Sequence, residues 1–86
     1  MLNPQKESAV QEELTRILAE VFRVPPHSIK ADSKISDLPN IESINLIRMI
    51  ALIERKFEIV IPIFTALHLD SVADIAREIA MNQRAR

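Results

Sequence analysis

Hydrophobic residues recur along this chain with the period of an amphipathic helix. They fall three or four positions apart over residues 8–23, over residues 43–57 and from Ser71 onward, a spacing that places them on one face of a helix. A further helical turn fits residues 62–68, because the ring of Pro62 suits the start of a helix. We therefore predict an all-α fold: a small helical bundle of three main helices plus one short helix, with a long loop after the first helix.

The first and last predicted helices begin with the pattern of a capping box. A serine is followed three residues later by a side chain that can bond back to it, Ser8 with Gln11 and Ser71 with Asp74. The residues before Ser8 are expected to be a frayed lead-in. The first helix is expected to end near Arg23, because the next residue precedes a proline and is pushed out of the α region.

A long connection, residues 24–42, joins the first two predicted helices. It holds three prolines and shows no helical period. Loops of this length inside compact domains are usually pinned or functional, so we predict a packed loop within a single domain over residues 1–86, with a core of roughly residues 8–82. The residues expected to anchor the loop are Ile29, Ile35, Leu38 and Ile41.

The chain contains no glycine, the residue that reaches a positive φ without steric cost. Helix ends and turns must therefore use other residues for left-handed backbone. Asn40 and Asn82 are the expected substitutes.

The central predicted helix, residues 43–57, carries apolar residues on two faces. The second stripe, Ile44, Ile47 and Ala51, is rotated away from the first. Apolar residues there either pack under the long loop or form a surface for something that docks beside Ser43. The first stripe is the expected contribution to the core: Leu46, Met49, Ile50, Ile53 and Phe57.

Ser43 stands at the start of this helix and has two interpretations. Serine commonly caps a helix, but the residue three positions later is Leu46, so no Glu or Gln completes a capping box. The unpaired N–H groups and the positive dipole at a helix start also favour a bound anion. Ser43 is thus either a cap or the attachment point of a phosphate-linked group, and local features leave both open.

Charge and composition argue against several classes of function. The net charge is −1 and the pI about 6.1, whereas nucleic-acid binding needs clustered Lys and Arg. Without cysteine, the chain cannot form disulfides, a thiolate nucleophile or a zinc site built on sulfur. No apolar run is long enough to span a membrane, and the N-terminus is too polar for a secretory signal. We therefore expect a cytoplasmic protein.

The sequence contains none of the common catalytic motifs. The two histidines, His27 and His68, lie in separate segments without ligand spacing, and neither a glycine-rich phosphate loop nor HExxH occurs. The acidic pair Glu12 and Glu13 falls in the first predicted helix, where it fits a solvated face. We expect neither catalysis by this chain nor a metal site.

The tripeptide Glu42-Ser43-Ile44 resembles Asp-Ser-Leu, the central motif of the acyl carrier protein family. The tripeptide alone is weakly specific, but the resemblance extends over roughly residues 10–80. After the serine, the family's pattern of hydrophobic residues, phenylalanine and closing proline is matched without a gap by Phe57, Ile59, Ile61 and Pro62, and then by Leu69, Ser71, Val72, Asp74 and Ile75. The family's first loop is resembled by Val24, Pro26, Ile29, Asp32, Ser33, Ile35, Asp37 and Leu38.

This resemblance implies a non-catalytic carrier in which Ser43 holds 4′-phosphopantetheine. A separate phosphopantetheinyl transferase moves that group from coenzyme A onto the serine hydroxyl, using Mg²⁺, and the thiol of the arm then holds an acyl or aminoacyl group as a thioester. Enzymes that load the arm and condense its cargo are the expected partners of a monomeric carrier. The residues expected to face these partners are Glu42, Ile44, Ile47, Arg48, Ala51 and Arg55.

Three departures from the family pattern stand out. The family has L-G-x-D-S, whereas Leu38 to Ser43 contains one extra residue and no glycine. Glutamate before the serine is a poorer cap than aspartate, so Asn40 is expected to start the helix one turn early and to bury Ser43 deeper. The family's exposed central face is typically acidic, whereas this chain has Asn45, Arg48, Arg55 and Lys56 there. We infer a specialised carrier, for a secondary-metabolite or modified-lipid pathway, in preference to a housekeeping fatty-acid carrier.

Two other classes of function compete with the carrier. A carrier-like helical domain that acts only through protein–protein contact would stay unmodified even with a broad-specificity transferase present. A DNA-binding helix-turn-helix is disfavoured by the charge balance. Within the carrier class, the pattern does not separate carriers of fatty acids, polyketides and amino acids.

Overall fold

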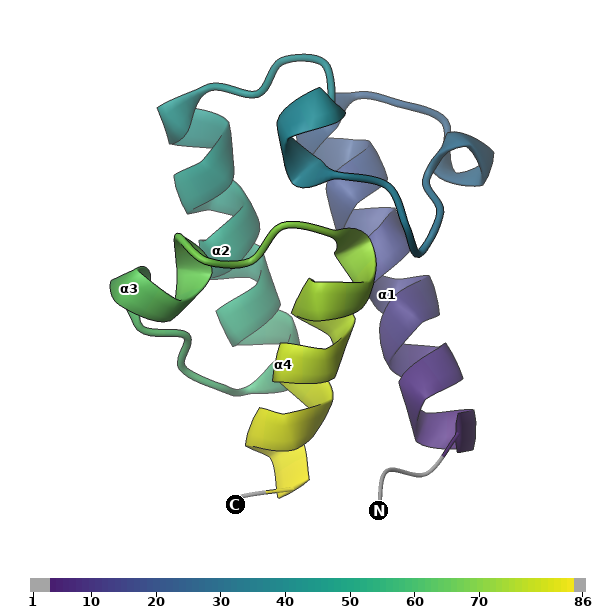
Figure 1. Cartoon of the computed structure of the whole chain (residues 1–86), viewed down its shortest axis with the longest axis vertical. Coiled ribbons are helices and arrows are strands. Elements are labelled where there is room, and N and C mark those ends of the chain that lie inside the picture. Colours follow the sequence, from purple (N-terminus) through teal and green to yellow (C-terminus); the bar gives the residue numbers. More distant parts are fainter. Residues whose placement is uncertain (1–3, 85–86) are drawn as a thin grey trace.

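The fold is a helical bundle, as predicted (Figure 1). The computed structural model describes residues 4–84, without the side chains of residues 4–8, 63 and 84. Within these residues the only β-structure is an isolated bridge between Lys34 and Ser71, and no helix is both long and apolar enough to cross a lipid bilayer. The elements in chain order are α1 (Pro4–Phe22), the 3₁₀ turns η1 (Pro26–Ser28) and η2 (Ile35–Asp37), α2 (Ser43–Phe57), α3 (Ile63–Ala66) and α4 (Val72–Arg84).

The three long helices share one core, with α1 in contact with both α2 and α4 (Figure 1). The predicted core stripe of α2 is confirmed, because Met49 and Ile53 are buried and the other three residues of the stripe pack partly buried against the core. Burying a large apolar side chain contributes about 1.5–3 kcal/mol. The largest fully buried side chains are Leu14, Leu18, Phe22, Ile53, Val72, Ile75 and Ile79.

The first helix begins earlier than predicted. α1 is already helical at Pro4, the first residue that the structure describes. Ser8 is therefore inside the helix, and its prediction as the N-cap is wrong; its side chain lies outside the described residues. The helix ends at Phe22, one residue before the predicted end at Arg23.

Two helices end in left-handed residues that are not glycine. Arg23 follows α1 with φ 57°, and Glu58 follows α2 with φ 54°. In both turns the next N–H donates to a carbonyl five residues back, at 3.1 Å, which is the bond of a Schellman motif. Of the two predicted left-handed residues, Asn40 is confirmed, with φ 60°. Asn82 is not, because it lies inside α4.

The long loop is packed, as predicted, and backbone hydrogen bonds join it to the start of α4. Ile29 and Ile35 are buried and Leu38 is half-buried against the core, whereas Ile41 is 36% exposed and does not anchor the loop. Three backbone hydrogen bonds of 2.8–3.0 Å join the loop to the start of α4: Ile35 N–H to Asp70 O, Val72 N–H to Ser33 O, and Ala73 N–H to Ala31 O.

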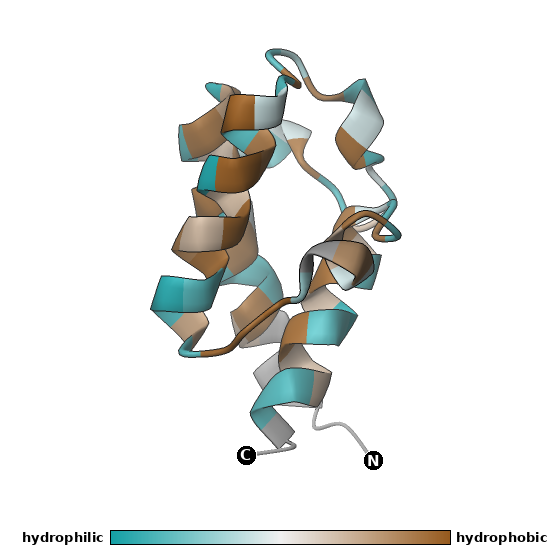
Figure 2. Cartoon of the chain, turned by 90° about the vertical axis from the view of Figure 1, so that its left-hand side faces the viewer, coloured by the Kyte–Doolittle hydropathy of each residue, from teal (hydrophilic) through white to brown (hydrophobic). Residues whose placement is uncertain are grey.

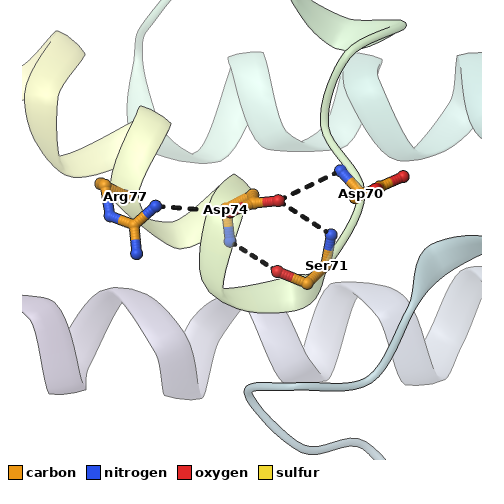
Figure 3. A network of polar contacts seen from close by, with 4 residues as sticks. All are labelled: Asp70, Ser71, Asp74 and Arg77. Atoms are coloured by element: carbon orange, nitrogen blue, oxygen red, sulfur yellow. Dashed lines mark hydrogen bonds and ion pairs between the residues drawn. The ribbon is translucent and has the colours of Figure 1, made fainter.

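The predicted capping box at the start of α4 is confirmed (Figure 3). The Asp74 N–H donates to Ser71 Oγ at 3.1 Å, and the Ser71 N–H donates to Asp74 Oδ2 at 3.3 Å. The Asp70 N–H and the Arg77 guanidinium also contact the Asp74 carboxylate, at 3.4 and 3.3 Å. The hydrogen bond from the Ser71 N–H, supported by the other donors and the Arg77 charge, lowers the pKa of Asp74 below its usual value.

Candidate functional site

The candidate site lies where the long loop turns into α2. Glu42 is the N-cap, with extended backbone (φ −113°, ψ 156°), and its carbonyl accepts hydrogen bonds from the N–H groups of Asn45 and Leu46 at 2.9 and 3.0 Å. Ser43 is therefore the first residue inside the helix, and its interpretation as the helix cap is wrong. The Glu42 side chain makes no capping hydrogen bond, in keeping with the low capping tendency of glutamate.

Ser43 presents an exposed hydroxyl at an open helix end. Its side chain is exposed, and its hydroxyl makes no hydrogen bond to any described residue. The backbone N–H groups of Ser43 and Ile44 likewise have no acceptor among residues 4–84. The first turn carries no acidic residue, so nothing within it offsets the positive end of the helix dipole. Such an end suits the oxygens of a phosphate ester.

Asn40 fixes the approach to this helix end. Its Nδ2 donates to the Phe22 carbonyl at 3.1 Å, and its own carbonyl accepts from Asn45 Nδ2 at 2.8 Å and from the Glu42 N–H at 2.9 Å. The expectation that Asn40 starts the helix one turn early is thus wrong, because its left-handed backbone forms a turn. Ser43 is consequently not pushed deeper into the helix. Asn is among the residues that tolerate this conformation best, which was the signal available in the sequence.

The predicted partner-facing residues all lie in contact with solvent. Ile44, Ile47, Arg48, Ala51 and Arg55, here called the outer face of α2, are exposed, and Glu42 is exposed beside them. The two isoleucines are 58% and 61% exposed. The second apolar stripe therefore does not pack under the long loop. Figure 2, in which α2 faces the viewer on the left, shows hydrophobic bands alternating with hydrophilic ones along this helix. That these residues contact partners stays a prediction.

Two other polar residues of α2 are engaged within the chain. Lys56 turns toward α1, where its Nζ lies 3.7 Å from Glu13 Oε1. Glu54 Oε2 accepts a hydrogen bond from the Ile61 N–H at 2.8 Å and so fastens the segment that leads to α3. Lys56 is exposed, as predicted, but it lies on the side of α2 that faces α1 and is therefore not counted in the outer face.

An apolar groove of about 250 Å³ runs between α2 and α3. Leu67, in the wall of the groove, is 70% exposed, and Phe64 of α3 is 75% exposed; neither was predicted as a surface residue. A helix of a single turn is too short for its apolar period to indicate which side faces the core. The groove is lined by Leu46, Ile47, Met49, Ile50, Ala51, Glu54, Ala66 and Leu67.

Comparison with known proteins matches most of this chain to one family. The family model "Phosphopantetheine attachment site" matches residues 12–79, which include Ser43 and the groove. An acyl carrier protein of Campylobacter curvus is 31% identical over 71 residues, covering 83% of this chain and 92% of that protein. Acyl carrier proteins of Wolinella succinogenes (27% over 75 residues; 87% and 99%) and Campylobacter hominis (33% over 66 residues; 77% and 84%) are also similar.

These matches cover most of the chain and nearly all of the relatives. They agree with the all-helical fold and with an open helix end suited to a phosphate ester. The chain belongs to the acyl carrier protein family, whose members are non-catalytic carriers with 4′-phosphopantetheine as their cofactor.

Proposed function

We propose that Ser43 is the residue to which 4′-phosphopantetheine is attached, and that the arm carries an acyl or aminoacyl group as a thioester. The observation that carries this proposal is the open start of α2, where an exposed hydroxyl without a hydrogen bond lies next to two N–H groups without acceptors in the described chain. A structural serine at a helix start would instead donate or accept in the first turn, as Ser71 does.

The loading step is a phosphoryl transfer catalysed by a separate phosphopantetheinyl transferase. Ser43 Oγ attacks the pantetheine-side phosphorus of coenzyme A, a new P–O bond forms, and the pyrophosphate P–O bond breaks. Adenosine 3′,5′-bisphosphate leaves, and the serine proton passes to a base of the transferase, which also brings the Mg²⁺. The carrier presents the hydroxyl, and the free N–H groups of Ser43 and Ile44 favour the negative charge of the phosphodiester. When bound, the cofactor supplies the thiol that the cysteine-free chain lacks.

The groove between α2 and α3 is suited to the apolar part of a carried group. Ile47 and Ala51 belong both to the groove and to the outer face of α2, so the groove opens on the same side of the helix as Ser43. Each methylene group buried there contributes about 0.8 kcal/mol. Because this groove already exists in the folded chain, part of a carried group can be covered without opening the core.

We further propose a specialised role in a modified-lipid or secondary-metabolite pathway of the cytoplasm. The support is the outer face of α2, where Arg48 and Arg55 are exposed and an ordinary acidic recognition face is missing. The partners are then the transferase, the enzymes that load the arm and those that condense its cargo. One domain with a core of roughly residues 8–82 is sufficient for this role.

The test is the intact mass of the protein before and after incubation with coenzyme A, Mg²⁺ and a broad-specificity phosphopantetheinyl transferase. The wild type should gain one phosphopantetheine, and Ser43→Ala should gain none while keeping its helical circular dichroism. Ser36→Ala, which removes another exposed serine, should load like the wild type. No gain on the folded wild type would overturn the proposal and indicate a domain that acts only through protein contacts.

A further inference from the structure

The outer face of α2 combines apolar side chains with arginines that form no ion pair within the described part of the chain. Arg48 and Arg55 are exposed and form no ion pair with any described residue. Other basic side chains are paired within the chain: Arg16 and Lys56 with Glu13, at 3.6 and 3.7 Å, and Arg77 with Asp74, at 3.3 Å. The two arginines of the outer face are thus available to charges outside the chain.

The acids around this face do not neutralise it. α2 contains three basic residues and a single acid, and that acid, Glu54, holds the Ile61 N–H beside the groove. Glu13 and Glu20 of α1 line a depression that Arg55 also lines, together with Arg16 and Lys56, and Glu13 is paired with both of these. Glu42 lies at the Ser43 end of the face. Along the middle of the outer face, around Arg48, α2 carries no acid within one turn.

The arginines and apolar residues follow the same line along the helix. Ile44, Arg48, Ala51 and Arg55 recur at intervals of four, three and four residues, which aligns them on one side of a helix. This line begins next to Ser43. An enzyme that reaches the Ser43 hydroxyl from solvent therefore meets the outer face first.

We propose that the enzymes acting at Ser43 dock on the outer face of α2 through an apolar pocket bordered by Asp and Glu side chains, which pair with Arg48 and Arg55. The proposal rests on the proposed function of Ser43 and adds the chemistry of the partner's surface. A guanidinium binds a carboxylate with two parallel hydrogen bonds, and arginine is enriched in protein interfaces while lysine is depleted. Complementary charge accelerates association, and a partner with a basic surface is repelled.

A nucleic-acid partner does not fit the same surface. Binding to duplex DNA uses many phosphate contacts made by clustered Lys and Arg. The outer face offers two arginines on a chain whose net charge is −1. The apolar residues between them, Ile44 and Ala51, would be left facing solvated phosphates.

The test uses one broad-specificity phosphopantetheinyl transferase in two forms: an enzyme whose carrier-docking surface is basic, and its variant with those basic residues changed to glutamate. The carriers are the wild type, R48E/R55E and the neutral R48Q/R55Q. The control K30E/K34E makes the same change in net charge on two exposed lysines of the long loop. Intact mass gives the rate of loading, and circular dichroism and thermal melting confirm that each carrier is folded.

With the basic transferase, R48E/R55E should lower KM about five- to tenfold, as expected for two exposed charge pairs. With the transferase variant that carries glutamates on its docking surface, R48E/R55E should raise KM by a similar factor. With either enzyme, the KM of R48Q/R55Q should lie between the values of the wild type and R48E/R55E. The control should behave like the wild type with both enzymes. Because neither arginine contacts the reacting atoms, kcat should change little. The KM differences should shrink when the ionic strength rises from about 0.02 to 0.2 M.

Two results would overturn the inference alone: loading with equal KM for all carriers, or an equal effect of K30E/K34E. Loading would then stand as the function, with docking independent of this face. No mass gain for any carrier with either transferase would overturn the proposed function, and this inference with it.

Discussion

Two helix starts in this small bundle are built in opposite ways. At the start of α4, the first four N–H groups all have acceptors: Val72 bonds to Ser33 O, Ala73 to Ala31 O, Asp74 to Ser71 Oγ and Ile75 to Ser71 O. At the start of α2, the N–H groups of Ser43 and Ile44 have none within the described chain, and the next two share the Glu42 carbonyl.

The difference separates a structural helix start from one suited to function. The start of α4 lies against the long loop, where a polar group without a partner would be costly. The start of α2 is exposed, so water can satisfy its N–H groups until a ligand replaces it. A serine therefore stabilises the fold at one start, whereas at the other it leaves its hydroxyl free for chemistry.

The largest effect on stability is expected at Asn40, which holds the open start in place. Asn40→Ala puts a residue with a Cβ and no amide into a left-handed turn, and also removes the hydrogen bond to the Phe22 carbonyl. The free energy of unfolding should fall by about 1–3 kcal/mol, measured by urea denaturation. Loading of Ser43 should also slow, because the turn positions the first residues of α2.

Asn40→Gly is the matched control, since glycine also lacks the amide but, unlike alanine, adopts the left-handed backbone without steric cost. Its cost should be smaller, about 0.5–1.5 kcal/mol. If Asn40→Ala and Asn40→Gly lost the same unfolding free energy, a role for the left-handed backbone would be contradicted. The side-chain hydrogen bond would then account for the whole effect.

A smaller effect on stability is expected when the serine at the start of α4 or of α2 is replaced by alanine. Ser71→Ala removes the acceptor of the Asp74 N–H and should cost about 1 kcal/mol, which corresponds to a fall in melting temperature of roughly 4–8 °C. Ser43→Ala removes no hydrogen bond to a described residue, so its free energy of unfolding should stay within about 0.5 kcal/mol of the wild type. A comparable loss of unfolding free energy in Ser43→Ala and Ser71→Ala would show that the start of α2 is not open in solution.

The smallest effect is the pH dependence of the α4 start. The lowered pKa of Asp74 means that its carboxylate stays charged in the folded chain at a pH where the unfolded chain, with an ordinary value of about 3.9, takes up a proton. The stabilisation is complete above that ordinary value and is lost as the pH falls through the folded pKa. The melting temperatures of wild type and Asp74→Asn should therefore converge between about pH 5 and pH 2. If the two melting temperatures instead differed by the same amount at every pH, the lowered pKa of Asp74 would be contradicted.

The periodic part of the fold was predictable from sequence. The bounds of α2 at Ser43 and Phe57 follow from its apolar period, and the α4 capping box follows from Ser71 and Asp74, because both signals are local. The same kind of local signal gave a wrong prediction at Ser8, where a capping-box pattern occurs inside a helix that already includes Pro4.

What the sequence did not predict depends on contacts between distant segments. The left-handed backbone at Arg23 and Glu58 has no propensity signal, because neither residue favours it, and it arises from the way each helix ends. The exposure of Ile41 and Leu67 depends on where the loop and α3 come to rest on the bundle. At the candidate site, the attachment role of Ser43 stays a prediction, and the role of Asn40 required the position of the Phe22 carbonyl, 18 residues away.

The α3 wall of the groove is expected to be much less stable than the α2 wall. α3 is a helix of four residues, far below the ~12–15 residues at which an isolated helix becomes marginally stable, and both Phe64 and Leu67 lie largely in solvent. Segments with few buried contacts open locally at a small fraction of the global free energy. Amide hydrogens of α3 should therefore exchange long before those of α2, and we expect the width of the groove to vary as α3 opens.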